Sequence, residues 1–518
     1  MRPRRASIVL TILLLTGALT GLGTVSARAA SVRHVSTTGS DTGDCIAAPC
    51  RTIGYAITQS VSGDTILIAA GTYAERVVID RSLTITGAGT ASTIVDGEAS
   101  GTVVTIGEPA ASVVVKISKL TIQNGQAQSG GGISSIPGPG QTNRVTMAMA
   151  AVSGNHVSGA GGASGSPGGP AYGGGIYNGV GSTMTIQGST IQGNTATGGG
   201  GGTNGFTGAG LSGGDAYGGG IYNAGTMSLN TSTVSTDVVA GGVGGPGVVC
   251  GIHGGAPGGP GGRGVGGGID SVGALTVVRG TLSGNSATGG TGGRGASGGL
   301  ACFHPGNGGP GGAGTGGGLS GQGLVANATI AANVASGGAG GPAGCNSHGC
   351  GTVGVGGAGA GGGIQAMGAI TLVNSTIAGN QASGGTGIST GGASGGGIDL
   401  AAGSTTSKNS ILAGDSAAAG PDCDGTVTSG GHNLLGSNSS CTGFTGSGDI
   451  VNADPLLGPL QNNGGPTFTM ALGSGSPAID AADDAACAAA PVKGVDQRGM
   501  PRPGGSHCDI GALEVQAS

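Results

Sequence analysis

The amino-acid sequence predicts an all-β chain wound into a parallel β-helix, a solenoid of short stacked strands, and two repeated features predict it. First, a glycine triplet is followed directly by an aliphatic residue seven times, at Ile133, Ile176, Ile221, Ile269, Leu319, Ile364 and Ile398. Second, each of these repeats closes on an amide or acid side chain, at Asn155, Asn194, Asp237, Asn285, Asn333, Asn380 and Asp415. A repeat of this length is too small to bury a hydrophobic face alone, so the repeats have to stack on one another.

Composition favours many thin layers over one thick core. The 518 residues include 128 glycines and no tryptophan, and only 2% are aromatic and 8% charged. Disordered chains are usually charged and poor in β-branched residues, which is the reverse of this sequence. The net charge of -5 is mild, and no basic patch suggests a nucleic-acid partner.

Aligning the repeats on the closing residue reconstructs one coil. Met184 and Ile186 alternate as a strand requires, and Ile191 follows just before Asn194. With the aliphatic residue after the triplet, this pattern predicts three short strands per repeat. Because Asn tolerates the left-handed backbone conformation and can bond the matching amide one coil away, we expect the closing residues to form a structural ladder. We also expect the aliphatic residues after the triplets to lie in one file.

Glycine-rich insertions separate the coils and have a period of three. Gly241, Gly244 and Gly247 follow this rule, as do Gly289, Gly292 and Gly295. A period of three with interspersed proline is typical of polyproline-II geometry, in which glycine lets backbones approach closely. Two interpretations remain open: hairpins that layer against one another along one corner of the solenoid, or flexible linkers.

The first 29 residues are predicted to be a signal peptide. Arg2, Arg4 and Arg5 precede an apolar run from Ile8 to Leu22, and a cleavage-like site lies at residues 27–29. No second apolar stretch is long enough to span a bilayer. Export favours disulfides among the ten cysteines, and spacing suggests the pairs Cys45 and Cys50, Cys250 and Cys302, Cys345 and Cys350, Cys423 and Cys441, and Cys487 and Cys508, although spacing does not prove them.

Two groups of residues are weighed as metal sites. Zinc or copper would accept the loop residues Cys250, His253, Cys302, His304, Cys345, His348 and Cys350, but it would need reduced thiolates, which export disfavours. Calcium would accept clustered oxygens from Asp480, Asp483, Asp484, Asp496 and Asp509. Capping salt bridges and turn contacts are the favoured role of these acids, so neither a metal nor another cofactor is predicted.

The N-terminal segment is predicted to form a lid over the first coil. Ile53, Ala56 and Ile57 fall on one face of a short helix that would cover the first coil, whose edge is otherwise unpaired. Here PCRTIGYAI followed by GDTILIAAGTYAE resembles the opening of right-handed parallel β-helix proteins of the pectin-lyase-like fold. The chain divides accordingly into a cap and first coils over 30–115, repeats with insertions over 116–418, and a C-terminal region over 419–518.

The C-terminal region carries a second resemblance. GHNLLG, DPLLGPLQNNGGPTFTMALGSGSPAIDAAD and DQRGMPRPGGSHCDIGALE are similar to the choice-of-anchor Q region at the ends of exported β-helix proteins. That resemblance implies surface or extracellular deployment and no particular reaction. Physically, Asp480, Asp496, Arg498 and Asp509 are expected to form a polar network across the last coil.

Catalytic residues are hard to find. Between Gly130 and Leu400 the charged residues are Arg144, Asp215, Asp237, Arg263, Asp270, Arg279, Arg294 and Asp399. Asp270 and Asp399 share a register, but Ser320 and Gln365 lie between them, and carboxylates so separated cannot flank one bond. We therefore assign no catalytic residue.

The sequence favours an exported, monomeric surface or extracellular-matrix protein, adhesive or polysaccharide-contacting, with a glycan or cell-surface polymer as partner. A polysaccharide lyase or glycoside hydrolase is the alternative. Ice binding is a third reading, which the irregular threonine positions disfavour.

Overall fold

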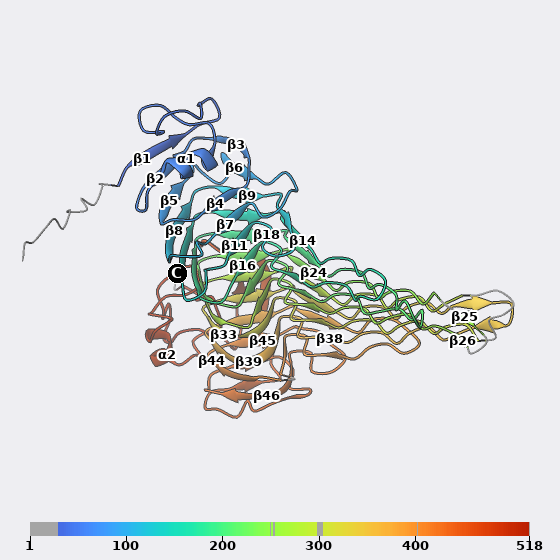
Figure 1. Cartoon of the computed structure of the whole chain (residues 1–518). Helices are drawn as coiled ribbons and strands as arrows, with labels where there is room; N and C mark the ends of the chain where they lie inside the picture. Colours follow the sequence, from blue (N-terminus) through green and yellow to red (C-terminus); the bar gives the residue numbers. More distant parts are fainter. Residues whose placement is uncertain (1–29, 249, 252–253, 298–303, 401, 517–518) are drawn as a thin grey trace, which may run out of the picture.

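The computed structural model describes residues 30–516 except 249, 252–253, 298–303 and 401, so the predicted signal peptide lies outside the described residues. The chain is a parallel β-helix, with coils stacked along one axis (Figure 1). Strands of successive coils pair in parallel, such as β16 (Ile176–Asn178) with β21 (Ile221–Asn223). The predicted fold class is confirmed.

Each central coil contributes to five files of strands, where three were predicted. The file after the glycine triplets contains β16, β21 and also β11 (Ile133–Ser135), β28 (Ile269–Ser271), β33 (Leu319–Ala326), β39 (Ile364–Val373) and β43 (Ile398–Asp399). The second contains β12 (Asn143–Ala148), β17 (Ser182–Gln187), β22 (Thr226–Asn230), β29 (Ala274–Val278) and β44 (Ser404–Lys408), while β33 and β39 run through both files. The third contains β13 (Ala151–Ser153), β18 (Thr190–Gln192), β23 (Thr233–Ser235), β30 (Thr281–Ser283), β34 (Thr329–Ala331), β40 (Thr376–Ala378) and β45 (Ile411–Ala413).

Two further files flank the insertions. The fourth contains β14 (His156–Ser158), β19 (Thr195–Thr197), β24 (Val238–Ala240), β31 (Ser286–Thr288), β35 (Val334–Ser336) and β41 (Gln381–Ser383). The fifth contains β15 (Ala171–Tyr172), β20 (Ala216–Tyr217), β27 (Gly264–Val265), β32 (Gly314–Thr315), β38 (Gly359–Ala360) and β42 (Ala393–Ser394). Their core is built from alanine and valine, including Val157, Ala196 and Ala216. Such small side chains leave little apolar periodicity to recognise.

The two ends of the solenoid use shorter or less regular strands. The first coils contain β1 (Val32–Val35), β2 (Thr65–Ile68), β3 (Gly71–Ala74), β4 (Val77–Ile79), β5 (Leu83–Thr86), β6 (Thr93–Asp96), β7 (Val104–Ile106), β8 (Val113–Ser118), β9 (Thr121–Gln123) and β10 (Gln126–Ala127). The C-terminal region contains β46 (Cys423–Ser429), β47 (Leu434–Leu435), β48 (Cys441–Thr442), β49 (Ile450–Val451), β50 (Leu457–Gln461) and β51 (Thr469–Leu472).

The hydrophobic core is one continuous column. Ile176 pairs with Ile221 and Ile221 with Ile269 in exact register, and all three are fully buried. The predicted single file of aliphatic residues is therefore confirmed. At the N-terminal end, helix α1 (Ile53–Gln59) covers this column with Ile53, which is buried as predicted.

The closing residues of the repeats form a chain of hydrogen bonds parallel to the axis. The Asn155 N–H donates to Asn194 Oδ1 at 3.1 Å, and the same contact recurs from Asn285 to Asn333 at 3.0 Å. It recurs between every neighbouring pair of the seven residues. The chain extends one step further than the sequence indicated, because the Asp415 N–H donates to Asp422 Oδ1 at 3.0 Å.

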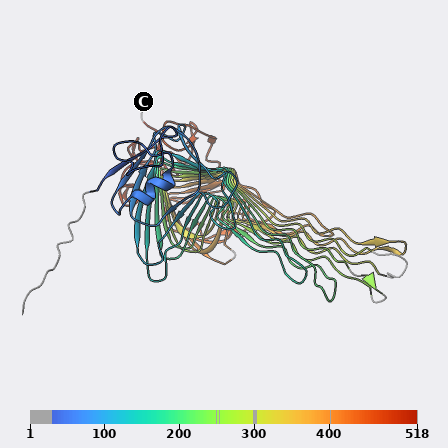
Figure 2. The same cartoon turned by 45° about the horizontal axis from the view of Figure 1, so that its top comes forward.

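The glycine-rich insertions form a layered projection that we call the blade, made of the described parts of 159–170, 198–215, 241–263, 289–313, 337–358 and 384–392. It leaves one corner of the solenoid, and β25 (Cys250–Gly251) and β26 (Gly254–Gly255) lie near its tip (Figures 1 and 2). Its arms are hydrogen-bonded across layers: Gly262 N–H donates to Gly242 O, and Gly290 N–H to Gly262 O, both at 2.8 Å. The layered interpretation is therefore correct, and the linker interpretation is wrong.

Replacing Gly290 by Ala is expected to loosen the blade without unfolding the solenoid. A Cβ at Gly290 would overlap the carbonyl oxygen of Gly242, and backbone cannot move aside as a flexible side chain can. Hydrogen exchange should show lost amide protection over the described parts of 241–263 and 289–313, with the core strands unchanged. Gly161→Ala is the control because nothing lies within 4 Å of its Cβ position. Equal effects of the two substitutions would contradict this packing.

The C-terminal region packs along the side of the solenoid, which corrects the expected position of its polar network across the last coil, although Asp496 still pairs with Arg498 and Asp509 with the Asp480 amide. The Gln497 amide nitrogen donates to Gly280 O at 3.0 Å, and the Thr329 hydroxyl donates to Gln497 Oε1 at 2.7 Å. Helix α2 (Asp484–Ala488) follows Asp483, whose N–H donates to Asn409 Oδ1 at 3.0 Å. The C-terminal region hydrogen-bonds to polar side chains of the third file, such as Thr281 and Thr329. In the sequence, these side chains follow the same repeat pattern as side chains that face solvent, so the contact was not predictable.

Disulfides join Cys45 to Cys50, Cys345 to Cys350, Cys423 to Cys441 and Cys487 to Cys508. The remaining suggested pair, Cys250 with Cys302, lies partly outside the described residues. Among the described residues, no helix has the length and apolar character needed to span a bilayer.

Candidate functional site

Two rows of outward side chains run beside each other along the solenoid, and we call them the paired files. The first file, on the strands after the triplets, contains Tyr177, Tyr222, Asp270, Ser320, Gln365 and Asp399 in register. The second file, on β15, β20, β27, β32, β38 and β42, contains Tyr172, Tyr217, Val265, Thr315, Ala360 and Ser394. Glycine triplets connect the two, and Gly173 has a φ of 62° because the chain turns sharply there.

Four tyrosines form a cluster at the N-terminal end of the paired files. Tyr172 stacks on Tyr217 with ring centroids 5.2 Å apart, and Tyr177 stacks on Tyr222 at 5.4 Å. Across the files, Tyr172 meets Tyr222 edge to face at 5.0 Å. All four are half-buried, so part of each ring remains accessible.

An ion pair borders the cluster. The Arg263 guanidinium donates to Asp215 Oδ2 at 3.2 Å and to the Tyr217 hydroxyl at 3.3 Å. The Tyr217 hydroxyl in turn donates to Asp215 Oδ2 at 3.0 Å. Arg263 is more than half exposed, so the pair contributes little to stability and mainly fixes the orientation of Tyr217.

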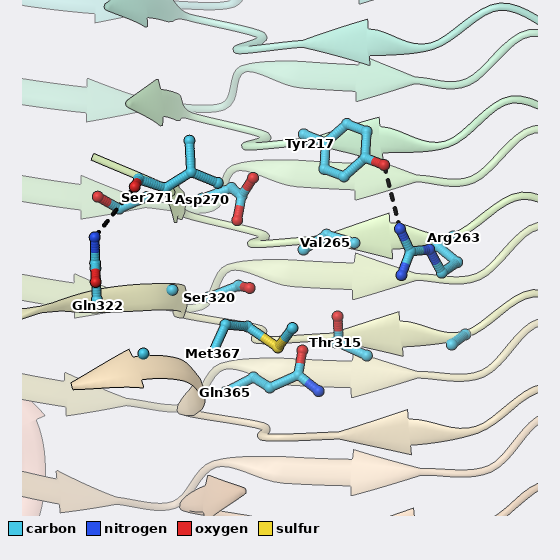
Figure 3. A pocket seen from close by; sticks show the side chains of 14 residues that line it. Tyr217, Arg263, Val265, Asp270, Ser271, Thr315, Ser320, Gln322, Gln365 and Met367 are labelled. Atoms are coloured by element: carbon cyan, nitrogen blue, oxygen red, sulfur yellow. Dashed lines mark hydrogen bonds between the residues drawn. The ribbon is translucent and has the colours of Figure 1, made fainter. Parts of the chain in front are cut away.

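A pocket of about 390 Å³ follows directly after the tyrosines (Figure 3). Tyr217, Val265 and Thr315 form one wall, and Asp270, Ser320 and Gln365 form the facing wall. Val272, Gln322 and Met367 also line it. The last two project from β33 and β39, which each continue from the first file into the second, with a shift of register in β33 between Gly321 and Gly323.

Asp270 is the one carboxylate among the residues that line this pocket. Its residue is 4% exposed, and the hydrogen-bond donor beside it is the Ser320 hydroxyl. Burial raises the pKa of Asp270 to about 7, while the nearby Ser320 hydroxyl and the Arg263 guanidinium oppose that rise. A carboxyl group with this pKa changes charge near neutral pH.

Asp399 is the other acid at this register position, and it lies too far from Asp270 to act on the same bond. It lies three coil steps from Asp270, or roughly 14 Å at about 4.8 Å per step. Asp399 accepts hydrogen bonds from Gln365 Nε2 at 3.4 Å and from the Ser394 hydroxyl at 3.3 Å. The predicted separation of the two carboxylates holds.

The candidate calcium ligands are not brought together. Asp483 pairs with Lys408 at 2.6 Å, Asp496 with Arg498 at 2.8 Å, and Asp484 with His507 at 2.8 Å. Asp480 and Asp509 accept backbone hydrogen bonds in turns. No group of three or more His, Cys, Asp or Glu residues suited to a metal occurs in the described part of the chain. Of the loop candidates for zinc or copper, Cys345 and Cys350 form a disulfide, and His253 and Cys302 lie outside the described residues.

The sequence analysis missed the tyrosine cluster, the Arg263 pair and the pocket. One signal was available: AYGGGIYN occurs twice, at 171–178 and 216–223, and contains four of the six tyrosines. The Arg263 pair had no such signal, because an insertion separates it from Asp215.

Comparison with known proteins adds a weak likeness of fold. No protein-family profile matches the chain, and no curated protein matches it. Among solved structures, pectate lyase Pel9A is similar with a TM-score of 0.39 and 11% identity, covering 93% of this chain and 96% of that one. Pectin methylesterase PemA from Erwinia chrysanthemi has a TM-score of 0.25 and 13% identity, covering 57% and 78%. The PL6 family alginate lyase AlyGC has a TM-score of 0.24 and 10% identity, covering 80% and 53%. Likeness this weak carries no information about activity.

Proposed function

We propose that this chain is an exported surface or matrix protein whose paired files bind polysaccharide without cleaving it. The observation that carries the proposal is the regular continuation of one surface over successive coils, from four half-buried tyrosines to a polar pocket. Aromatic rings with polar tips offer large contact areas and hydrogen bonds together. Repetition along the axis suits a ligand that is itself a linear repeat, because weak contacts add along its length.

Export and attachment belong to the same proposal. The four described disulfides suit an oxidising compartment. The signal peptide over 1–29 and the choice-of-anchor Q resemblance over the C-terminal region support deployment outside the cell. We propose a monomer that contacts a glycan or cell-surface polymer and needs no cofactor.

Cleavage is the second candidate function, and the raised pKa of Asp270 favours it. A carboxyl group that titrates near pH 7 suits general acid or base catalysis in a glycoside hydrolase or polysaccharide lyase. Hydrolysis by paired carboxylates needs them about 5–10 Å apart, and the pocket lining contains one. Incubation of the mature chain with neutral and acidic polysaccharides decides between the candidates. The appearance of new reducing or unsaturated ends would show cleavage and favour the enzyme over the non-catalytic binding protein.

Binding is tested with a glycan array and calorimetry on the mature chain. Tyr177→Ala is expected to weaken binding of the glycans retained by the wild type about tenfold, since it removes one stacking ring outside the pocket. Phe206→Ala is the matched control, because Phe206 is an aromatic residue 97% exposed on the blade. Retention of no glycan by the wild type, or equal loss in both variants, would refute the proposed function.

A further inference from the structure

The pocket contains polar groups whose hydrogen bonding is incomplete. Asp270 is almost fully buried, and the Ser320 hydroxyl is the one hydrogen-bond donor beside it among the described residues. Ser320, the next residue in its file, is fully buried, and its hydroxyl has no partner within 3.5 Å. Buried polar groups nearly always have partners, and a buried carboxylate with a single neighbouring donor is especially costly. These groups therefore indicate a ligand that supplies donors.

The Asp270 side chain is directed from its strand toward the space bounded by Tyr217 and Arg263 on the facing wall (Figure 3). Val265 and Met367 add apolar surface to the same pocket. Its volume of about 390 Å³ lies at the small end of the range of ligand sites and suits one or two six-membered rings. An apolar wall facing an acceptor wall matches a sugar ring, which has an apolar face and hydroxyl groups at its edge.

Charge on the two walls selects against ionic sugars. Arg263 borders the pocket, but its charge is already neutralised by Asp215. An anionic sugar would therefore gain little from Arg263 and would face the Asp270 carboxylate. A cationic amino sugar would pair with Asp270 but would lose the hydration of its ammonium group between walls that include Val265 and Met367. A neutral sugar meets neither the repulsion nor this desolvation cost.

We propose that the pocket binds one neutral pyranose residue of a polysaccharide, with two adjacent hydroxyl groups donating to the Asp270 carboxylate and the apolar ring face against Tyr217. This deepens the proposed function by naming the class of sugar and the residue that recognises it. Gln365 supplies a further hydrogen bond to a hydroxyl group from the same wall as Asp270.

Binding through Asp270 is coupled to proton release. Hydroxyl groups donate to the ionised carboxylate, whereas burial raises the pKa of free Asp270 to about 7. The charged and titratable groups around it are Arg263, Tyr217 and Tyr222, of which the tyrosines stay neutral below pH 9 because burial raises the pKa of both phenols. Affinity is therefore expected to rise between pH 5.5 and pH 8, in step with ionisation of Asp270.

Asp270→Asn is the test, with neutral oligosaccharides, oligouronates and chitosan oligomers as probes in calorimetry. Neutral oligosaccharides should bind the variant about 10- to 100-fold more weakly, because hydrogen bonds to a charged acceptor are lost. The rise of affinity with pH should vanish. The melting temperature of the free variant should increase at pH 8, because a charge that is unfavourably desolvated by burial has been removed. A residue with only a structural role would lower the melting temperature.

Two further variants make the outcome decisive. Asp237→Asn replaces another buried acid with a raised pKa, one that lies outside the paired files and does not line the pocket, and should leave affinity and its pH dependence unchanged. Asp270→Ser copies the next residue of the file and should reproduce the loss seen with Asn. Full binding by both Asp270 variants, or tighter wild-type binding of oligouronates or chitosan oligomers than of neutral probes, would overturn the assignment. If glycan binding persists in both Asp270 variants but is lost in Tyr177→Ala, only the sugar site at Asp270 is refuted. If the wild type binds no glycan, the proposed function fails as well.

Discussion

Replacing Asp237 by Asn is expected to stabilise the folded chain by about 3–5 kcal/mol at pH 8 and to have almost no effect at pH 4. Asp237 occupies one rung of the axial ladder, is fully buried, and accepts hydrogen bonds from Asn194 at Oδ1. Its other oxygen, Oδ2, has no partner. In Asn194 and Asn285 the amide nitrogen at that position donates to the carbonyl of Val152 and Val234. Asp237 can donate there only when it is protonated.

The direction of the pH effect follows from the pKa. Burial raises the pKa of Asp237 to about 8 in the folded chain, against an ordinary value of 3.8, although hydrogen bonds from Asn194 oppose this. Below pH 3.8 the acid is protonated in both folded and unfolded chains, so its contribution to stability is complete. As the pH rises from 3.8 toward 8, only the unfolded chain loses the proton, and stability falls by about 1.4 kcal/mol per pH unit.

The ladder provides a reciprocal control. Asn285→Asp places an acid in the next rung and should destabilise the chain at pH 8 while changing little at pH 4. Denaturant unfolding at both pH values measures all three proteins. If Asp237→Asn lowers stability at pH 8, then Asp237 is ionised in the fold and the ladder is held by charge, which would contradict the neutral rung.

The ladder also shows where sequence reasoning succeeds and where it stops. Spacing from the glycine triplet was enough to place Asn194 and Asp237 at one corner of successive coils, because a stacked repeat leaves one register that buries every aliphatic residue. Spacing does not report protonation, which depends on how completely the coil excludes water. The identity of the rung was therefore predictable, and its charge state was not.

The candidate site was less predictable for a geometric reason. Asp270 and Ser320 were placed in one file from their position after the triplet, and the structure agrees. Their facing wall lies on two-residue strands without large inward side chains, so no periodicity marks it. Similarly, Gln497 hydrogen-bonds to Thr281 from a position 216 residues away, and no repeat pattern connects them. Contacts within the repeat were predictable, whereas contacts between a repeat and a unique segment were not.

Asp64→Asn is expected to destabilise the N-terminal coils by about 3–5 kcal/mol, because it leaves a buried guanidinium without its counter-charge. Arg33 and Asp64 have fully buried side chains, and Arg33 Nε and Nη2 donate to Asp64 Oδ2 at 3.0 and 2.9 Å. Asp64 also accepts the Ser31 and Val61 amides at 2.7 and 3.0 Å. Hydrogen exchange over β1, β2 and α1 should report the loss, since coils of a solenoid open locally.

The pH dependence of this pair is opposite to that of the ladder. Burial alone would raise the pKa of Asp64, but the Ser31 and Val61 amides and the Arg33 guanidinium together hold it below 3.8. The stabilisation is therefore present above pH 3.8, and it is lost as the pH falls through the pKa that Asp64 has in the folded chain. Asp80→Asn is the matched control, because Asp80 forms a partly exposed pair that contributes less than about 1 kcal/mol. Comparable losses at Asp64 and Asp80 would mean that water reaches the inner pair, and the lid would then not seal the first coil.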